Sequence, residues 1–101
     1  MTAKQFKELA IDVIKNKMST YDILNLKNRT PEHFKARKIY YTALMLLKSI
    51  NHYTYRRFTK RELNGMIDAS RCVRERKGFG KEAKIYLDLI KERIIKERLV
   101  K

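Results

Sequence analysis

The amino-acid sequence predicts an all-α fold, a single compact bundle of about six helices. Apolar residues recur every three or four positions along most of the 101 residues, which is the spacing of a helix with one buried face. No stretch shows the two-residue alternation of a half-buried strand, and no repeat or low-complexity segment interrupts the chain. A hydrophobic fraction of 44% is typical of a globular protein. We therefore expect residues 1–101 to form one domain.

The first helix is expected from about Ala3 to Asn16. Its inward positions follow the helical repeat and are Phe6, Leu9, Ala10, Val13 and Ile14. Ser19 and Thr20 are then candidate N-caps for a short second helix around residues 22–24.

A long central helix is expected after an aperiodic linker at residues 25–29. Thr30-Pro31-Glu32 is a strong start signal, because a capping hydroxyl is followed by proline at the first helical position and then by an acid. The helix should reach about Ser49, and residues 39–47 are apolar nearly all round, so this half should lie in the core. The first half carries side chains that we expect to remain in water, namely Lys35, Arg37 and Lys38.

Residues 51–58 are aromatic and basic, and they predict a brief helix that leads directly into the next one. Thr59 is a candidate N-cap for a helix over residues 60–76. The inward stripe expected for that helix is Leu63, Met66, Ile67, Ser70 and Val73. Its opposite side carries Arg61, Glu62, Asn64, Asp68, Arg71 and Arg74.

The last helix is expected from Lys81 to about Val100, because Lys77-Gly-Phe-Gly80 should break the chain before it. Its inward positions are Ala83, Tyr86, Leu87, Ile90 and Ile94. Its other face alternates Lys, Glu and Arg, which is typical of a solvated surface.

The charge balance narrows the class of partner. The chain has 25 Lys and Arg against 11 Asp and Glu, a net charge of +14. Such a charge favours polyanions as partners: DNA, RNA, an anionic membrane or an acidic protein. The excess concentrates between residues 48 and 81, where ten basic residues face three acids.

Several other classes of function find no support in the sequence. Cys72, His33 and His52 have no spacing that metal sites use, so we expect no metal or other cofactor. No carboxylate pair, nucleophile–base set or phosphate-binding loop is apparent, so we expect neither an enzyme nor a small-molecule substrate. The longest apolar run, residues 39–47, is too short to cross a membrane. A single cysteine suits a reducing cytoplasm.

The helix over residues 60–76 carries the main functional hypothesis. A helix that directs the polar residues of its first turn out of a basic surface is typical of the recognition helix of a helix-turn-helix, here at about residues 51–76. The candidate base readers are Arg61, Glu62, Leu63 and Asn64. Candidate phosphate contacts are Lys48, Arg56, Arg57, Lys60, Arg71 and Arg74.

Some of these features also have an interpretation that involves structure alone and no ligand. The helix is also consistent with an ordinary amphipathic helix with a solvated face. Glu62 is suited to complementing the helix dipole, and Leu63 to the top of the core stripe. Arg61 near a helix N-terminus is locally unfavourable, which favours a functional role for it.

Three segments carry a resemblance to a known family. Residues 6–29 begin with Phe-Lys-Glu-Leu and end in Asp-Ile-Leu-Asn-Leu-Lys-Asn-Arg, Lys35-Ala-Arg-Lys-Ile39 follows, and residues 58–71 are in register with F-G-G-R-D-H-T-T-V-L-H-A-C-R. The identical positions in the last segment are Phe58, Arg61, Ala69 and Arg71. Over nearly its whole length the chain resembles the C-terminal DNA-binding domain, domain IV, of the bacterial replication initiator DnaA.

The resemblance implies a helical fold similar to that domain and to Trp repressor. It implies that residues 61–64 enter the major groove of double-stranded DNA and that Arg29, in the loop before the long helix, enters the adjacent minor groove. It also implies a role in replication initiation or its regulation, with a bacterial, phage or mobile-element origin.

The chain departs from that family at the residues that matter most for base reading. Thr59-Lys60 replaces Gly-Gly, Glu62 lengthens the acid, and Leu63-Asn64 replaces His-Thr. Leucine offers a base edge only apolar contact, with no hydrogen bond. An alternative therefore stays open, a protein-interaction module that engages replication proteins or an acidic partner without reading DNA sequence. Binding to structured RNA is a third possibility and rests on charge alone.

Overall fold

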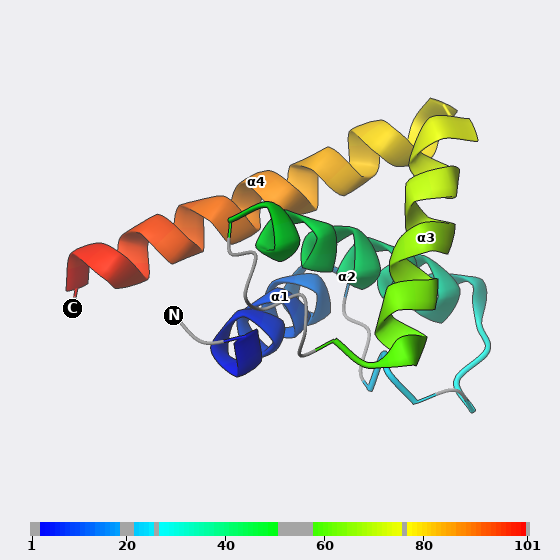
Figure 1. Ribbon diagram of the computed structural model, residues 1–101, viewed down its shortest axis with the longest axis horizontal. Helices are drawn as coiled ribbons and strands as arrows, with labels where there is room; N and C mark the ends of the chain where they lie inside the picture. The colour runs from blue at the N-terminus through cyan, green and yellow to red at the C-terminus, as the bar shows by residue number, and fades with distance from the viewer. Residues whose placement is uncertain (1–2, 19–21, 26, 51–57, 76, 101) are drawn as a thin grey trace.

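Four helices account for the regular structure of the residues that the computed structural model describes: 3–18, 22–25, 27–50, 58–75 and 77–100, without the side chains of residues 3, 46–50, 77 and 98–100. They are α1 (Ala3–Met18), α2 (Pro31–Ile50), α3 (Lys60–Glu75) and α4 (Lys77–Val100) (Figure 1). The described chain measures 37 × 28 × 27 Å and contains no strand. The prediction of a compact all-α fold is confirmed for these residues.

The core is built around α2, which packs against each of the other three helices. Side chains from all four helices and from the loop before α2 meet there, and the largest fully buried ones are Tyr40, Phe6, Ile14, Ile23, Ile39, Leu44 and Ile90. The prediction that the second half of this helix lies in the core is confirmed as far as Leu44. None of the described helices is both long enough and apolar enough to cross a bilayer.

The described residues contain four helices, whereas about six were expected for the whole chain. Residues 22–25 and 27–30 form turns instead of a short helix, because Asp22 adopts a left-handed backbone conformation with φ of 54°, which no right-handed helix accommodates. Ile23 is nevertheless buried. The brief helix expected at 51–58 falls almost entirely outside the described residues; Phe58 is described, and it is buried and not helical.

The expected break at residues 77–80 is wrong, since α4 already begins at Lys77. Gly78 and Gly80 each cost a helix about 1 kcal/mol relative to alanine. Burial of the Phe79 ring between them contributes about 2 kcal/mol in return. Gly80 also faces Val73 at the end of α3, where a Cβ on this glycine would lie 3.5 Å from the Val73 carbonyl oxygen. This is an ordinary van der Waals distance, so α4 starts directly beside the end of α3.

The inward stripe of α3 is also different from the expected one. Met66 and Ala69 are buried, and Leu63 and Cys72 pack against the core, but Ile67 is 60% exposed. Val73 is exposed as well. The cause is that α3 approaches α2 at Gly65, which lies against the Tyr41 ring, and Ile67 is on the other side of the helix from Gly65. Met66 and Leu63 thus face the core as expected, whereas Ile67 and Val73 do not.

Candidate nucleic-acid interface

The first turn of α3 is closed by a reciprocal pair of hydrogen bonds between Thr59 and Glu62. The Glu62 backbone N–H donates to Thr59 Oγ1 at 3.1 Å, and the Thr59 backbone N–H donates to Glu62 Oε1 at 3.0 Å. This is a capping box, which satisfies backbone donors that the start of a helix would otherwise leave unpaired. The prediction of Thr59 as the N-cap is confirmed.

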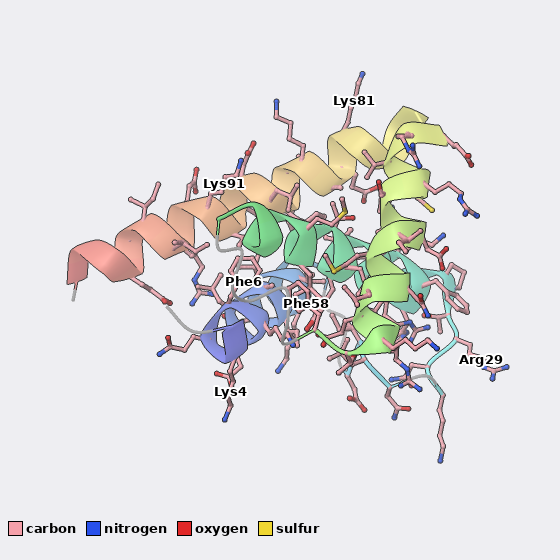
Figure 2. The ribbon with its side chains drawn as sticks, viewed as in Figure 1. Lys4, Phe6, Arg29, Phe58, Lys81 and Lys91 are labelled. Atoms are coloured by element: carbon pink, nitrogen blue, oxygen red, sulfur yellow. The ribbon has the colours of Figure 1, made fainter. Side chains whose placement is uncertain are left out.

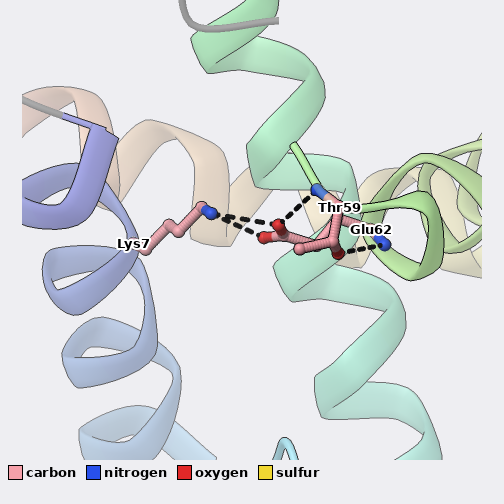
Figure 3. A network of polar contacts seen from close by, with 3 residues as sticks. All are labelled: Lys7, Thr59 and Glu62. Carbon is pink, nitrogen blue, oxygen red and sulfur yellow. Dashed lines mark hydrogen bonds and ion pairs between the residues drawn. The ribbon is translucent and has the colours of Figure 1, made fainter. Parts of the chain in front are cut away.

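A lysine from α1 fixes the same turn to the rest of the molecule. Lys7 Nζ lies 2.8 Å from Glu62 Oε2 and donates to Glu62 Oε1 at 3.1 Å (Figure 3). The same ammonium group lies 5.4 Å from the centre of the Phe58 ring. Since these contacts join residues far apart in the chain, they set where α3 begins relative to α1.

The Glu62 carboxylate is therefore occupied within the protein. Its side chain is only 14% exposed. Burial by itself raises the pKa of the Glu62 carboxyl, but the hydrogen bonds from Lys7 and Thr59 and the charge of Lys7 outweigh burial and lower that pKa below its ordinary value. Glu62 stays ionised and holds the start of α3 in position.

The outer face of α3, by contrast, presents side chains to solvent. Its exposed polar residues are Lys60, Arg61, Asn64, Asp68, Arg71, Arg74 and Glu75. Four of these residues are cations: Lys60, Arg61, Arg71 and Arg74. Neither these four side chains nor that of Asn64 forms an ion pair or a side-chain hydrogen bond with another described residue. These groups are available to a ligand.

The loop that carries Arg29 is held by a buried arginine of α2. Arg37 is 6% exposed, and its guanidinium donates hydrogen bonds to the carbonyl oxygens of Ile23 (3.2 Å), Asn25 (3.0 Å) and Asn28 (2.8 Å). The expectation that Arg37 remains in water is therefore wrong. A planar group with five fixed donors can bind several carbonyl oxygens of one turn, which a lysine cannot do.

Further bonds within the loop shape the same turn. Asp22 accepts at its carbonyl oxygen from the Asn25 backbone N–H at 3.1 Å and from Asn28 Nδ2 at 3.0 Å. Thr30 then caps α2, because its Oγ1 accepts from the His33 backbone N–H at 3.2 Å. The predicted N-cap is confirmed, and Arg29 stands exposed between this cap and the clamped turn.

A groove lies between α2 and the start of α3. It measures about 510 Å³, and its lining comes from the first half of α2 and from α3: Phe34, Arg37, Lys38, Tyr41, Lys60, Arg61, Asn64, Gly65 and Asp68. Arg37 lines this groove and also holds the loop, so the loop lies close to the first turn of α3. In Figure 2 the Arg29 side chain extends from the molecule on the side where α3 begins.

The four candidate base readers thus separate into two pairs. Arg61 and Asn64 are exposed, whereas Glu62 is held by Lys7 and Leu63 packs against the core.

The structure describes the side chains of three of the six candidate phosphate contacts. Lys60, Arg71 and Arg74 are exposed on α3. Arg56, Arg57 and the side chain of Lys48 lie outside the described residues.

Sequence reasoning missed two residues that position the site, Arg37 and Lys7. Arg37 stands in the Ala-Arg pair that carries the family resemblance, and that pair was the available signal for it. Lys7 had no such signal, since its partner lies 55 positions along the chain. Within the described part of the chain, no three His, Cys, Asp or Glu side chains gather in a way that could hold a metal ion.

Comparison with known proteins does not identify a family for this chain. No protein-family model, no curated protein sequence and no solved structure matches this chain. The likeness to DnaA domain IV therefore rests on the sequence segments quoted above, and the site is interpreted from its own residues.

Proposed function

We propose that this protein binds double-stranded DNA in a sequence-specific manner, with α3 in the major groove. The observation that supports this most directly is the outer face of α3, where four cations and Asn64 are exposed and without partners among the described residues. An α-helix fits the major groove of B-DNA, where each base pair displays a distinct set of donors and acceptors.

In this proposal Arg61 and Asn64 read base edges. An arginine guanidinium donates two hydrogen bonds to guanine O6 and N7, and an asparagine amide pairs with adenine N6 and N7. Asn64 follows Arg61 by three positions on an exposed helix face, so the two side chains can reach neighbouring base pairs. Each good contact of this kind discriminates against a wrong base by about 1–3 kcal/mol.

The remaining residues of the site bind the backbone or position the readers. Lys60, Arg71 and Arg74 contact phosphates, which adds affinity without sequence information. Glu62 orients the first turn through Thr59 and Lys7, in place of a contact to a base.

Arg29 enters the adjacent minor groove. Its loop is clamped by Arg37, so little ordering entropy is lost when DNA binds.

Charge supports the proposal at the level of the whole chain. A net charge of +14 attracts duplex DNA at long range. With about six phosphate contacts, log K should fall against log[salt] with a slope on the order of −5. The resemblance to the initiator domain gives the biological setting that we propose, DNA replication initiation or its regulation, with replication proteins as further partners.

The test is a selection from randomised DNA duplexes by the purified protein at near-physiological salt. We expect an enriched site with a guanine and an adenine at neighbouring base pairs, and we expect Arg61→Ala and Asn64→Ala to lose it. Lys91→Ala is the matched control, because Lys91 is an exposed cation on α4, away from this surface (Figure 2). If the wild-type protein enriches no sequence, the proposal is wrong, and capture of protein partners becomes the next experiment.

A further inference from the structure

Ile67 is the most exposed large apolar side chain on α3, with 60% of its surface accessible to solvent. Single exposed apolar residues are common on protein surfaces and need no explanation by themselves. The surroundings of Ile67 are what distinguish it. It lies on the helix face that we propose to enter the major groove, although its place in the sequence pattern predicted that it would face the core.

Ile67 belongs to a row of exposed residues along α3, which we call the Ile67 row: Lys60, Asn64, Ile67, Arg71 and Arg74. Residues three, four or seven positions apart lie on one side of a helix. Asn64 precedes Ile67 by three positions and Arg71 follows it by four. The acids Asp68 and Glu75 lie at one edge of the row, four positions after Asn64 and Arg71, while the members of the row next to Ile67 are an amide and a cation.

A partner for this row must combine an apolar group with acceptors and negative charge. Duplex DNA has that combination in the major groove wherever thymine occurs. The C5-methyl group of thymine stands beside acceptor atoms of the base edges, and phosphates line both sides of the groove.

We infer that Ile67 contacts the C5-methyl group of a thymine in the bound DNA, and that it is a specificity-determining residue. This inference rests on the proposed function, because it requires α3 to lie in the major groove. Three residues of helix rise about 4.5 Å, and one base step rises about 3.4 Å. The thymine therefore lies within about two base steps of the adenine that Asn64 contacts.

The test replaces each thymine of the most enriched duplex, one at a time, by deoxyuridine, which lacks only the methyl group. Fluorescence anisotropy measures the dissociation constant for each duplex. One replacement should weaken binding by wild-type protein about fourfold, the effect of withdrawing one buried methyl from contact. Ile67→Ala should bind the thymine and deoxyuridine duplexes with equal affinity.

Ile85→Ala provides the matched control. Ile85 is 51% exposed and lies on α4, outside the Ile67 row, so this variant should keep the wild-type sensitivity to deoxyuridine. Thermal melts establish that both variants fold, which is expected because neither side chain is buried.

The outcomes separate the inference from the proposed function. If a sequence is enriched but no thymine replacement affects wild-type binding, Ile67 reads no methyl group and base reading by Arg61 and Asn64 still stands. The same conclusion follows if Ile67→Ala remains as sensitive as wild type. If no sequence is enriched at all, both proposals are wrong.

Discussion

Gly65 determines how closely α3 approaches α2. A Cβ built on this glycine would lie 2.7 Å from atoms of the Tyr41 ring, closer than real contacts allow. The ring is half-buried beneath the helix and packs edge-on against Tyr40, with ring centres 5.5 Å apart. The absence of a side chain at position 65 thus lets the backbone of α3 rest on an aromatic ring.

Gly65→Ala should therefore destabilise the fold by about 1–3 kcal/mol, the usual cost of overpacking. The loss should appear although alanine favours a helix by about 1 kcal/mol relative to glycine. Urea denaturation measures the difference. Gly78→Ala is the control, because a Cβ there meets nothing within 4 Å, and it should be neutral or stabilising. Equal effects of the two substitutions would show that the approach to Tyr41 does not constrain α3.

Arg37 is the second residue that holds one part of the fold in place, the turn before α2. Arg37→Met should destabilise the protein by about 2–4 kcal/mol, because three carbonyl oxygens lose hydrogen bonds from a charged donor. Amide hydrogen exchange should also accelerate in the loop before α2.

Arg29→Met carries the same substitution at an exposed arginine and should leave stability unchanged. If Arg37→Met melts like Arg29→Met, the loop is held by other contacts.

At the scale of elements, the start of α3 depends on an ionised carboxylate. The pKa of Glu62 is lowered in the folded protein, so the unfolded chain binds the proton first as the pH falls. The stabilisation is fully present above the ordinary pKa of 4.5 and is lost as the pH drops through the lowered value.

Glu62→Gln should cost about 1 kcal/mol at neutral pH, because glutamine can still complete the capping box but cannot pair ionically with Lys7. The difference between wild type and variant should shrink towards zero below the ordinary pKa of Glu62. The midpoints of urea denaturation, measured for both proteins at a series of acidic pH values, report this difference in stability. Glu92→Gln, at an exposed glutamate of α4, is the matched control. A Glu62→Gln effect that is independent of pH would contradict this account.

The helices were predictable where a local signal marks their ends. Thr30-Pro31 and Thr59 with Glu62 are capping patterns, and both α2 and α3 begin where these patterns place them. The start of α4 was not predictable, because the burial of Phe79 is a tertiary effect that overrides the glycine signal.

The candidate site was predictable only in part, for a related reason. The exposure of Arg61 and Asn64 follows from helical spacing. The outward position of Ile67 depends instead on Gly65 and Tyr41, which belong to different helices. The burial of Arg37 depends on a turn that the chain forms more than eight residues earlier.

At the scale of the whole molecule, α2 is the central helix, and the candidate site lies beside its N-terminal half. Its first half lines the groove beside α3, and it holds the Arg29 loop through Arg37. The fourth helix runs from the end of α3 along the opposite side of the bundle (Figure 1). The proposed base readers, the described phosphate candidates and the loop arginine are thus attached to one packed core, which suits the proposed reading of DNA sequence.

The central claim is that α3 reads base sequence, and the most direct test is a ratio of affinities. Dissociation constants are measured for the enriched duplex and for a scrambled duplex of the same composition, with wild-type protein, Asn64→Ala and Arg74→Ala. Asn64→Ala should lower the difference in binding free energy between the two duplexes, which is RT times the logarithm of this ratio, by about 1–3 kcal/mol. Arg74→Ala should weaken binding to both duplexes by the same factor. It should also reduce the slope of log K against log[salt] by about one. If Asn64→Ala instead weakens both duplexes equally, Asn64 does not read a base and the account is wrong.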